Sequence, residues 1–192
     1  LTAGSIQWMT AGRGIVHSEM PEQEQGAMQG FQLWVNLPAK DKMTAPRYQD
    51  IAPENVPEVD LGGGSKVRVL VGRFGATDGP VSNIATDPTY LDVHLAPNAR
   101  FQATLVTTHN AFLYVYQGVA KIGAEEKEIV RGDLAVLGGG DVVTATAGEA
   151  PCRFILVAGR PLNEPVARYG PFVMNTREEI MQAVNDFNAG RF

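Results

Sequence analysis

The chain has 192 residues, of which 44% are hydrophobic, and a formal net charge of −5 at pH 7. This length and apolar content suffice for one large domain or two small ones, and they exclude a chain that is disordered throughout. The negative balance, without a cluster of Lys and Arg, argues against direct binding of nucleic acid. The single cysteine, Cys152, excludes an internal disulfide. No apolar run reaches the ~18 residues of a membrane span, and no signal peptide is visible, so we expect a soluble cytoplasmic protein.

Short β-rich runs, separated by glycine or proline, recur along the chain at spacings that are typical of sandwiches and barrels. The predicted strands cover residues 5–9, 30–36, 67–72, 90–95, 111–117, 120–122, 134–137, 142–146 and 153–158. Helical periodicity is almost absent from this part of the chain. The pattern therefore predicts an all-β fold.

A single helix is predicted at the end of the chain. Thr176 and Glu179 have the spacing of a capping box, and Ile180, Val184 and Phe187 follow at helical spacing. Gly190 is a plausible end of the helix. We expect this helix to cover one sheet with its apolar stripe.

The segment 46–64 differs in composition from the rest of the chain. It contains three prolines, several acidic residues and the glycine triplet at 62–64. This composition predicts a linker or a long irregular crossover between two halves. An elaborate surface loop within one domain fits the composition equally well.

The most informative motif is His17-Ser18-Glu19. On an extended segment, side chains two residues apart point to the same side, so both groups could reach one metal ion. Non-haem iron sites usually combine about two imidazoles and a carboxylate. The chain has only three histidines, and His94 and His109 lie far downstream. Either long-range folding completes the site, or its other ligands lie outside this chain; taken alone, such a pair is more often a surface pairing.

The other two histidines have simpler interpretations. His94 shares its strand face with Asp92, which predicts an exposed, salt-linked pair. His109 precedes Asn110 at the start of an apolar run, which predicts a turn or strand-edge residue with local hydrogen bonds. Cys152 begins another apolar run, and we expect it to serve in packing.

Several separated blocks resemble one family. The run QWMTAGRGIVHSEM at 7–20 resembles the signature of the pirins, which are two-domain cupins, and further blocks follow in order at 32–38, 46–49, 161–166 and 169–176. The resemblance implies an all-β bicupin, with two double-stranded β-helix (jelly-roll) barrels and a short C-terminal α-helix. It divides the chain into part of the N-terminal metal-binding cupin (1–45), a linker or crossover (46–64), a C-terminal cupin without metal ligands (65–175) and a helix with tail (176–192).

The resemblance also implies an iron(II) site, in which two histidines of an early His-Pro-His segment join a later histidine and glutamate. His17 and Glu19 match the later pair, whereas the early segment has no counterpart in this sequence. The chain therefore looks like a pirin whose first cupin is incomplete. We expect Fe(II), or another divalent transition metal, to bind weakly or not at all to this chain alone.

Two functions follow as expectations. The first is a quercetin 2,3-dioxygenase-type activity of the intact protein on a flavonol, with Glu19 as both metal ligand and catalytic base. The second is a non-enzymatic, metal-dependent regulator that binds a transcription factor or a metabolic enzyme. Because an incomplete first barrel exposes sheet edges, we also expect pairing with the missing N-terminal segment or with a strand-swapped copy.

Overall fold

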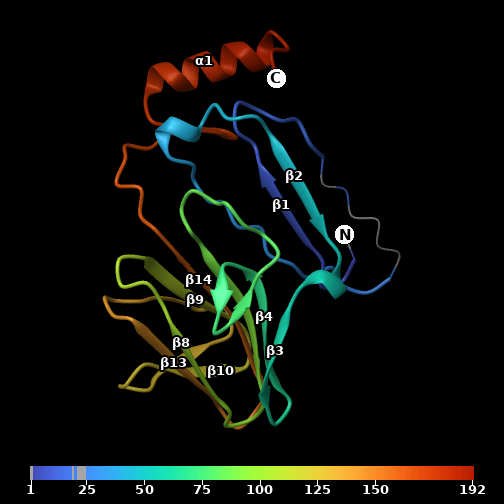
Figure 1. Ribbon diagram of the computed structural model, residues 1–192, viewed down its shortest axis with the longest axis vertical. Coiled ribbons are helices and arrows are strands. Elements are labelled where there is room, and N and C mark those ends of the chain that lie inside the picture. The colour runs from blue at the N-terminus through green and yellow to red at the C-terminus, as the bar shows by residue number, and fades with distance from the viewer. Residues whose placement is uncertain (1, 19, 21–24) are drawn as a thin grey trace. The chain divides into compact units, whose positions relative to one another are not determined.

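The structure is a computed structural model that describes residues 2–18, 20 and 25–192 (Figure 1). The chain folds into two compact units. Unit 1 comprises Leu1–Trp8 and Asp50–Pro161, and unit 2 comprises Met9–Gln49 and Leu162–Phe192. Each unit is therefore built from two separate stretches of sequence.

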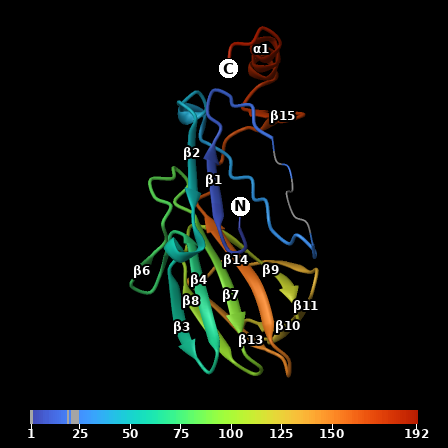
Figure 2. The same ribbon diagram turned by 90° about the vertical axis from the view of Figure 1, so that its right-hand side faces the viewer.

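Unit 1 consists mainly of two antiparallel sheets, which can be followed in Figures 1 and 2. The first has six strands, in the spatial order β12 (Leu134–Val136), β9 (Asn110–Gln117), β14 (Cys152–Gly159), β7 (Thr89–Leu95), β4 (Ser65–Val71) and β3 (Glu58–Gly62). The second has four strands, in the order β11 (Lys127–Val130), β10 (Val119–Ile122), β13 (Val142–Ala147) and β8 (Arg100–Thr104). A small hairpin of β5 (Arg73–Phe74) and β6 (Thr77–Asp78) and the 3-10 turn η2 (Pro53–Asn55) complete the unit.

The main core of unit 1 is formed by buried side chains of both sheets. Leu156 in β14 lies opposite Leu91 in β7 and Leu113 in β9, and all three are fully buried. Removing one such side chain from water contributes about 1.5–3 kcal/mol to stability. Cys152, at the start of β14, is also fully buried, which agrees with its predicted packing role.

A second apolar cluster of unit 1 begins where β4 changes register. Val67 and Val69 belong to the main core, but the pairing of β4 with β7 shifts between Val69 and Val71. Such an irregularity redirects the side chains that follow it. Leu70 and Val71 consequently join a separate cluster. Its other members are Ile51, Val56 and Val81, with Ile6, Trp8, Ile84 and Tyr90 packed against them.

Unit 2 has less regular structure. Its elements are the 3-10 turn η1 (Ala39–Asp41), the hairpin of β15 (Ala167–Tyr169) and β16 (Phe172–Met174), and the helix α1 (Arg177–Asn188). The two-stranded sheet of β1 (Ile6–Thr10) and β2 (Arg47–Ile51) contains residues of both units. The helix packs on the β15–β16 hairpin and buries Ile180, so the small hairpin is the sheet that it covers.

The capping box of α1 is confirmed. The Thr176 hydroxyl accepts a hydrogen bond from the Glu179 amide at 3.2 Å, and the Glu179 carboxylate accepts one from the Thr176 amide at 3.0 Å. The same carboxylate accepts from the Asn175 amide at 2.8 Å. These bonds satisfy amides that have no partner within the helix.

The predicted all-β class with one C-terminal helix is confirmed, and eight of the nine predicted strands have counterparts. The strand predicted at 30–36 is wrong: this segment is irregular, and Trp34 stays 62% exposed, so its alternating apolar residues are not buried in a sheet. The prediction also missed β2, β3, β8 and β11, which are short and rich in polar residues, and the two small hairpins β5–β6 and β15–β16.

The segment 46–64, predicted to be a linker or crossover, contains β2 and β3, and β3 pairs with β4 at the edge of the six-stranded sheet. The boundaries of units 1 and 2 are set by contacts rather than by chain order, and the predicted domain limits at 45, 64 and 175 stay predictions. Within the described part of the chain, no helix is both long and apolar enough to cross a membrane.

Candidate functional site

The segment that leads to His17 is fixed by two glycines of unit 2. Gly12 has a φ of +55°, and a Cβ atom there would lie 2.2 Å from the carbonyl oxygen of Thr44. The same carbonyl accepts a hydrogen bond from the Arg13 amide at 2.9 Å. Gly14 has a φ of +136°, and a Cβ atom there would lie 2.6 Å from the ring of Phe192. Only glycine fits both positions without displacement of a neighbour.

The ring that lies against Gly14 belongs to an aromatic cluster of unit 2. Phe192 lies 6.2 Å from Phe172 and 5.8 Å from Phe187, between ring centroids, and Phe172 and Phe187 are 6.1 Å apart. Tilted and edge-on pairs at such distances are favourable beyond their burial. The cluster therefore joins α1 and β16 to the glycine segment before His17.

Lys42 lies two residues before Thr44, whose carbonyl accepts from the Arg13 amide. It is buried, and its ammonium group donates to Asn36 Oδ1 at 2.7 Å and to the Val173 carbonyl at 3.3 Å. Burial lowers the pKa of Lys42, although the charges of Glu164 and Glu179 act in the opposite direction. Lys42 thereby ties the chain just before Thr44 to β16.

His17 itself is exposed and lies outside the strands. The predicted pairing of His17 with Glu19 assumed the alternation of side chains along a strand. Because His17 is not in a strand, this assumption does not hold for it. Glu19 lies outside the residues that the structure describes. The pair His17 and Glu19 remains a prediction.

The described residues do not by themselves fit a transition metal. Among residues 2–18, 20 and 25–192, no three His, Cys, Asp or Glu side chains come together in a way that could hold an ion. A protein-bound transition metal of the expected kind takes about three protein ligands. His17 alone falls short of that number.

His94 occupies a polar cluster on the six-stranded sheet of unit 1. Its Nε2 lies 3.1 Å from Asp92 Oδ2, which confirms the predicted pair, and the Tyr116 hydroxyl donates to Asp92 Oδ1 at 2.6 Å. Arg68 Nη1 is 3.7 Å from Asp92. The pair is half-buried rather than exposed, because Tyr116 and Arg68 enclose it.

This enclosure changes the acid–base behaviour of the cluster. Burial disfavours the charged form of Asp92, but hydrogen bonds from His94 and Tyr116, with the charges of His94 and Arg68, outweigh it and lower the pKa of Asp92. Burial, together with the nearby Asp92 charge, raises the pKa of Tyr116. The cluster is thus a stable arrangement of a carboxylate with donors around it, and it is satisfied without any ligand.

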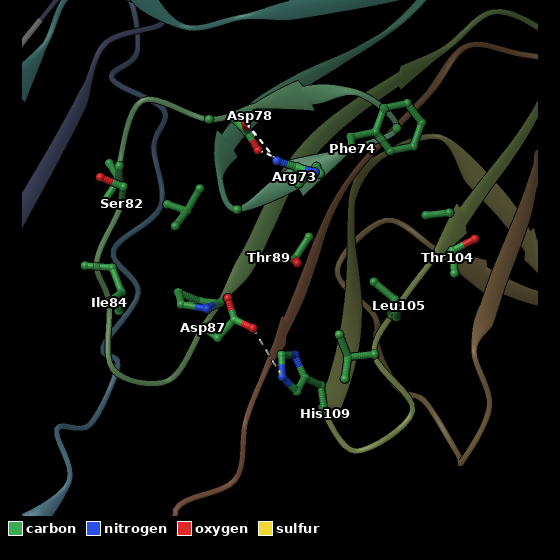
Figure 3. A pocket seen from close by; sticks show the side chains of 18 of the residues that line it. Arg73, Phe74, Asp78, Ser82, Ile84, Asp87, Thr89, Thr104, Leu105 and His109 are labelled. Atoms are coloured by element: carbon green, nitrogen blue, oxygen red, sulfur yellow. Dashed lines mark hydrogen bonds and ion pairs between the residues drawn. The ribbon is translucent and has the colours of Figure 1, made fainter.

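His109 lines a cavity of about 1050 Å³ in unit 1 (Figure 3). Its amide donates to the Val106 carbonyl at 2.9 Å, which confirms the predicted turn. The side chain, however, is only 4% exposed, and its Nε2 lies 3.9 Å from Asp87 Oδ2. No pattern in the sequence indicates this approach, because Asp87 comes from a distant loop. The predicted local hydrogen bond is thus made by the His109 amide, whereas its imidazole faces a residue that is distant in sequence.

Comparison with known proteins identifies the family of the chain. Residues 90–192 match the model of the pirin C-terminal cupin domain, and residues 1–35 match that of pirin. A pirin-like protein of Caulobacter vibrioides is 47% identical over 190 residues, which cover 98% of this chain and 68% of the relative. A protein of Pseudomonas aeruginosa that carries the provisional name quercetin 2,3-dioxygenase is also 47% identical, over 99% of this chain and 68% of its own length.

A solved structure gives the same result. The crystal structure of a quercetin 2,3-dioxygenase from Acinetobacter baumannii superposes with a TM-score of 0.89 and 34% identity, over 98% of this chain and 67% of that one. The chain thus spans about two thirds of the length of these relatives. With its two jelly-roll sheets, its C-terminal helix and these matches, the chain belongs to the pirin family of cupins.

Proposed function

We propose that the chain takes part in a quercetin 2,3-dioxygenase-type reaction, in which a flavonol is oxidised by dioxygen. The observation that carries the proposal is the 34% identity and TM-score of 0.89 with the Acinetobacter baumannii quercetin 2,3-dioxygenase, over 98% of this chain. Likeness of this extent includes the glycine segment before His17 as well as the two sheets.

His17 and Glu19 are the residues that we propose to act at the metal, and Glu19 is in addition the proposed base for the flavonol hydroxyl. What supports His17 is its segment: Gly12 and Gly14 hold a conformation that other residues would strain, and Phe192 and the Thr44 carbonyl hold it from two directions. A divalent transition metal would supply Lewis acidity and a site for oxygen. Pirin-family likeness favours iron over other metals.

The test measures metal content and quercetin-dependent oxygen uptake in one preparation of the intact protein with Fe(II) added, because this chain alone is expected to bind the metal weakly or not at all. The variants are His17→Ala and Glu19→Gln, with His94→Gln as the matched histidine control, because His94 belongs to the satisfied cluster on unit 1. Loss of an outer partner of a metal ligand already costs about 10–100-fold in metal affinity or activity. Loss of a ligand is expected to cost at least as much.

The expected result is that both site variants lose iron and oxygen uptake while His94→Gln keeps both. Unchanged turnover in the two site variants would remove their assigned roles. An iron-loaded parent protein that leaves quercetin and oxygen unconsumed would overturn the dioxygenase proposal. The alternative function, a metal-dependent regulator that binds a transcription factor or metabolic enzyme, stays a prediction.

A further inference from the structure

The strongest unexplained feature of unit 1 is the cavity beside His109, which we name the His109 cavity. Its wall combines apolar and polar side chains in about equal number, and its volume of about 1050 Å³ is at the upper limit of small-molecule sites. Among the apolar residues are Val81, Ile84, Leu105 and Val106. The reaction proposed above uses none of them.

His109 is the polar group of this cavity that faces Asp87. Its side chain is 4% exposed, and its Nε2 lies 3.9 Å from the Asp87 carboxylate, beyond hydrogen-bond distance. A ligand atom that bonds this nitrogen would replace water that has little access to it. Figure 3 shows the ring of His109 directed toward the Asp87 carboxylate.

The separation of the two groups suits one kind of ligand atom. A single oxygen placed between them could lie about 2.8 Å from both Nε2 and Oδ2, since twice that length exceeds the gap. A hydroxyl oxygen accepts from an imidazole N–H and donates to a carboxylate, so it satisfies both residues at once. An ionised carboxylate ligand has no proton to donate, and any anion would be repelled by Asp87.

The remaining charges at the cavity do not favour an anion either. Arg73 Nε donates to Asp78 Oδ1 at 2.6 Å, and its Nη2 donates to Oδ2 at 3.0 Å, so its guanidinium is already engaged. This ion pair lies on the β5–β6 hairpin at the border of the cavity (Figure 3). A neutral ligand is therefore favoured, and its apolar body would lie against the apolar part of a wall that also contains neutral polar side chains such as Ser82, Thr89 and Thr104.

We propose that the His109 cavity binds a small neutral molecule that carries a hydroxyl group on an apolar ring or chain, with the hydroxyl between His109 and Asp87. The site lies wholly within unit 1 and needs no metal. It is a second binding site, separate in sequence from His17 and Glu19.

The test is an NMR titration of the ¹⁵N-labelled full chain with phenol and with cyclohexanol, in the presence of a chelator. Toluene, which has the ring without the hydroxyl, and benzoate, which is anionic, are the ligand controls. The expected result is saturable shifts of the amides around His109 and Asp87 with one or both hydroxyl compounds, and at least about tenfold weaker binding of toluene and benzoate. The response to phenol against cyclohexanol distinguishes an aromatic from an aliphatic ligand.

The variants are Asp87→Ala and His109→Gln, with Asp78→Ala at the border as the matched control. Asp87 is exposed, with 66% of its side chain accessible, so no core packing is lost with it even if the His109 variant is unstable. Because its φ of +46° is left-handed and disfavours alanine, the ¹⁵N spectrum of each variant is first compared with that of the parent fold. Both site variants are expected to weaken phenol or cyclohexanol binding roughly tenfold, and Asp78→Ala and His17→Ala to leave it unchanged.

Three results would overturn the proposal: no saturable shift with either hydroxyl compound, equal binding of toluene, or equal binding by Asp87→Ala. A shift at His109 produced by Fe(II) or Zn²⁺ alone, with none from the hydroxyl compounds, would make the cavity a metal site and overturn it as well. None of these outcomes depends on quercetin turnover, so the two proposals fail separately.

Discussion

Units 1 and 2 are stabilised in different ways. Unit 1 has two paired sheets and two apolar clusters of buried residues, whereas among the described residues of unit 2 only Pro38, Lys42 and Ile180 are buried. Unit 2 relies instead on an aromatic cluster, a buried ammonium group and a helix cap. Segments with few buried apolar contacts open at lower free energy. The proposed reaction residues therefore belong to the less stable unit, and the His109 cavity belongs to the more stable one.

The largest expected effect is the loss of a core side chain from unit 1. Leu156→Ala should lower the free energy of unfolding by about 2–5 kcal/mol, because the fully buried leucine leaves a cavity between β7 and β9. Urea denaturation measures the change. Val136→Ala is the control, since Val136 lies in the same sheet but is 80% exposed. If Leu156→Ala lowered the free energy of unfolding by less than about 1 kcal/mol, burial in the sheets would not be what stabilises unit 1.

The polar cluster of unit 1 gives a pH-dependent prediction. Tyr116→Phe removes the 2.6 Å hydrogen bond to Asp92 and should cost about 1.5–3 kcal/mol at neutral pH. The folded pKa of Asp92 is lowered, so the stabilisation is fully present above the unfolded pKa of about 3.9 and is lost as the pH falls through the folded pKa. The deficit of the variant should therefore shrink below about pH 4.

The free energy of unfolding of Tyr116→Phe and of the parent protein is measured by denaturation between pH 2.5 and 7, in steps of about 0.5 pH unit. The measurement shows whether the difference between the two proteins shrinks at low pH. The exposed Tyr169 provides the control variant, Tyr169→Phe, for which no difference is expected at any pH. A Tyr116→Phe deficit that grows on acidification would show that the hydroxyl does not favour the ionised carboxylate.

Unit 2 is tested at its glycine segment. Gly14→Ala should destabilise this unit by about 1–2 kcal/mol from the left-handed backbone alone, and further because the methyl group would displace Phe192. Gly30→Ala is matched to it: Gly30 lies in the same unit, has no left-handed φ, and has open space around its Cα. Thermal melting and the NMR shifts of the Phe192 ring report the change. Equal effects of the two substitutions would mean that Phe192 does not hold the segment.

The smallest expected effect concerns the helix cap. Thr176→Ala removes the acceptor for the Glu179 amide and should cost about 0.5–2 kcal/mol of local stability. Amide hydrogen exchange in the first turn of α1 measures it. Exchange within β14 should not change, because that strand belongs to unit 1. Accelerated exchange in β14 would indicate that the two units open together.

The parts of the fold that could be predicted are those specified by nearby residues. The box at Thr176 and Glu179 defined the start of α1, and the alternation of Leu91, Val93 and Leu95 defined β7. The strand β8 was missed, although Phe101 and Ala103 alternate with polar residues, because its five residues are short and carry little apolar signal. In segment 30–36 the apolar residues alternate in a similar way, but they are not buried in a sheet. The pattern alone therefore could not distinguish the strand β8 from the irregular segment 30–36.

The candidate sites depended on residues far apart in sequence. The contacts that hold the segment at Gly12 and Gly14 come from Thr44 and Phe192, which lie far along the chain. His109 was placed in its turn, yet its approach to Asp87 depends on how a distant loop folds over the cavity. A sequence pattern reports local conformation and burial, whereas these pairings arise only when the tertiary structure forms.

The single cysteine offers a natural reporter for opening of the sandwich. Cys152 is fully buried in β14, and burial raises its pKa to about 11. Because thiolate is the reactive form, an alkylating reagent at neutral pH can modify it only during transient exposure of that strand. The alkylation rate of Cys152 therefore reports how often this part of unit 1 opens, without any engineered probe. A ligand bound in the His109 cavity should lower that rate.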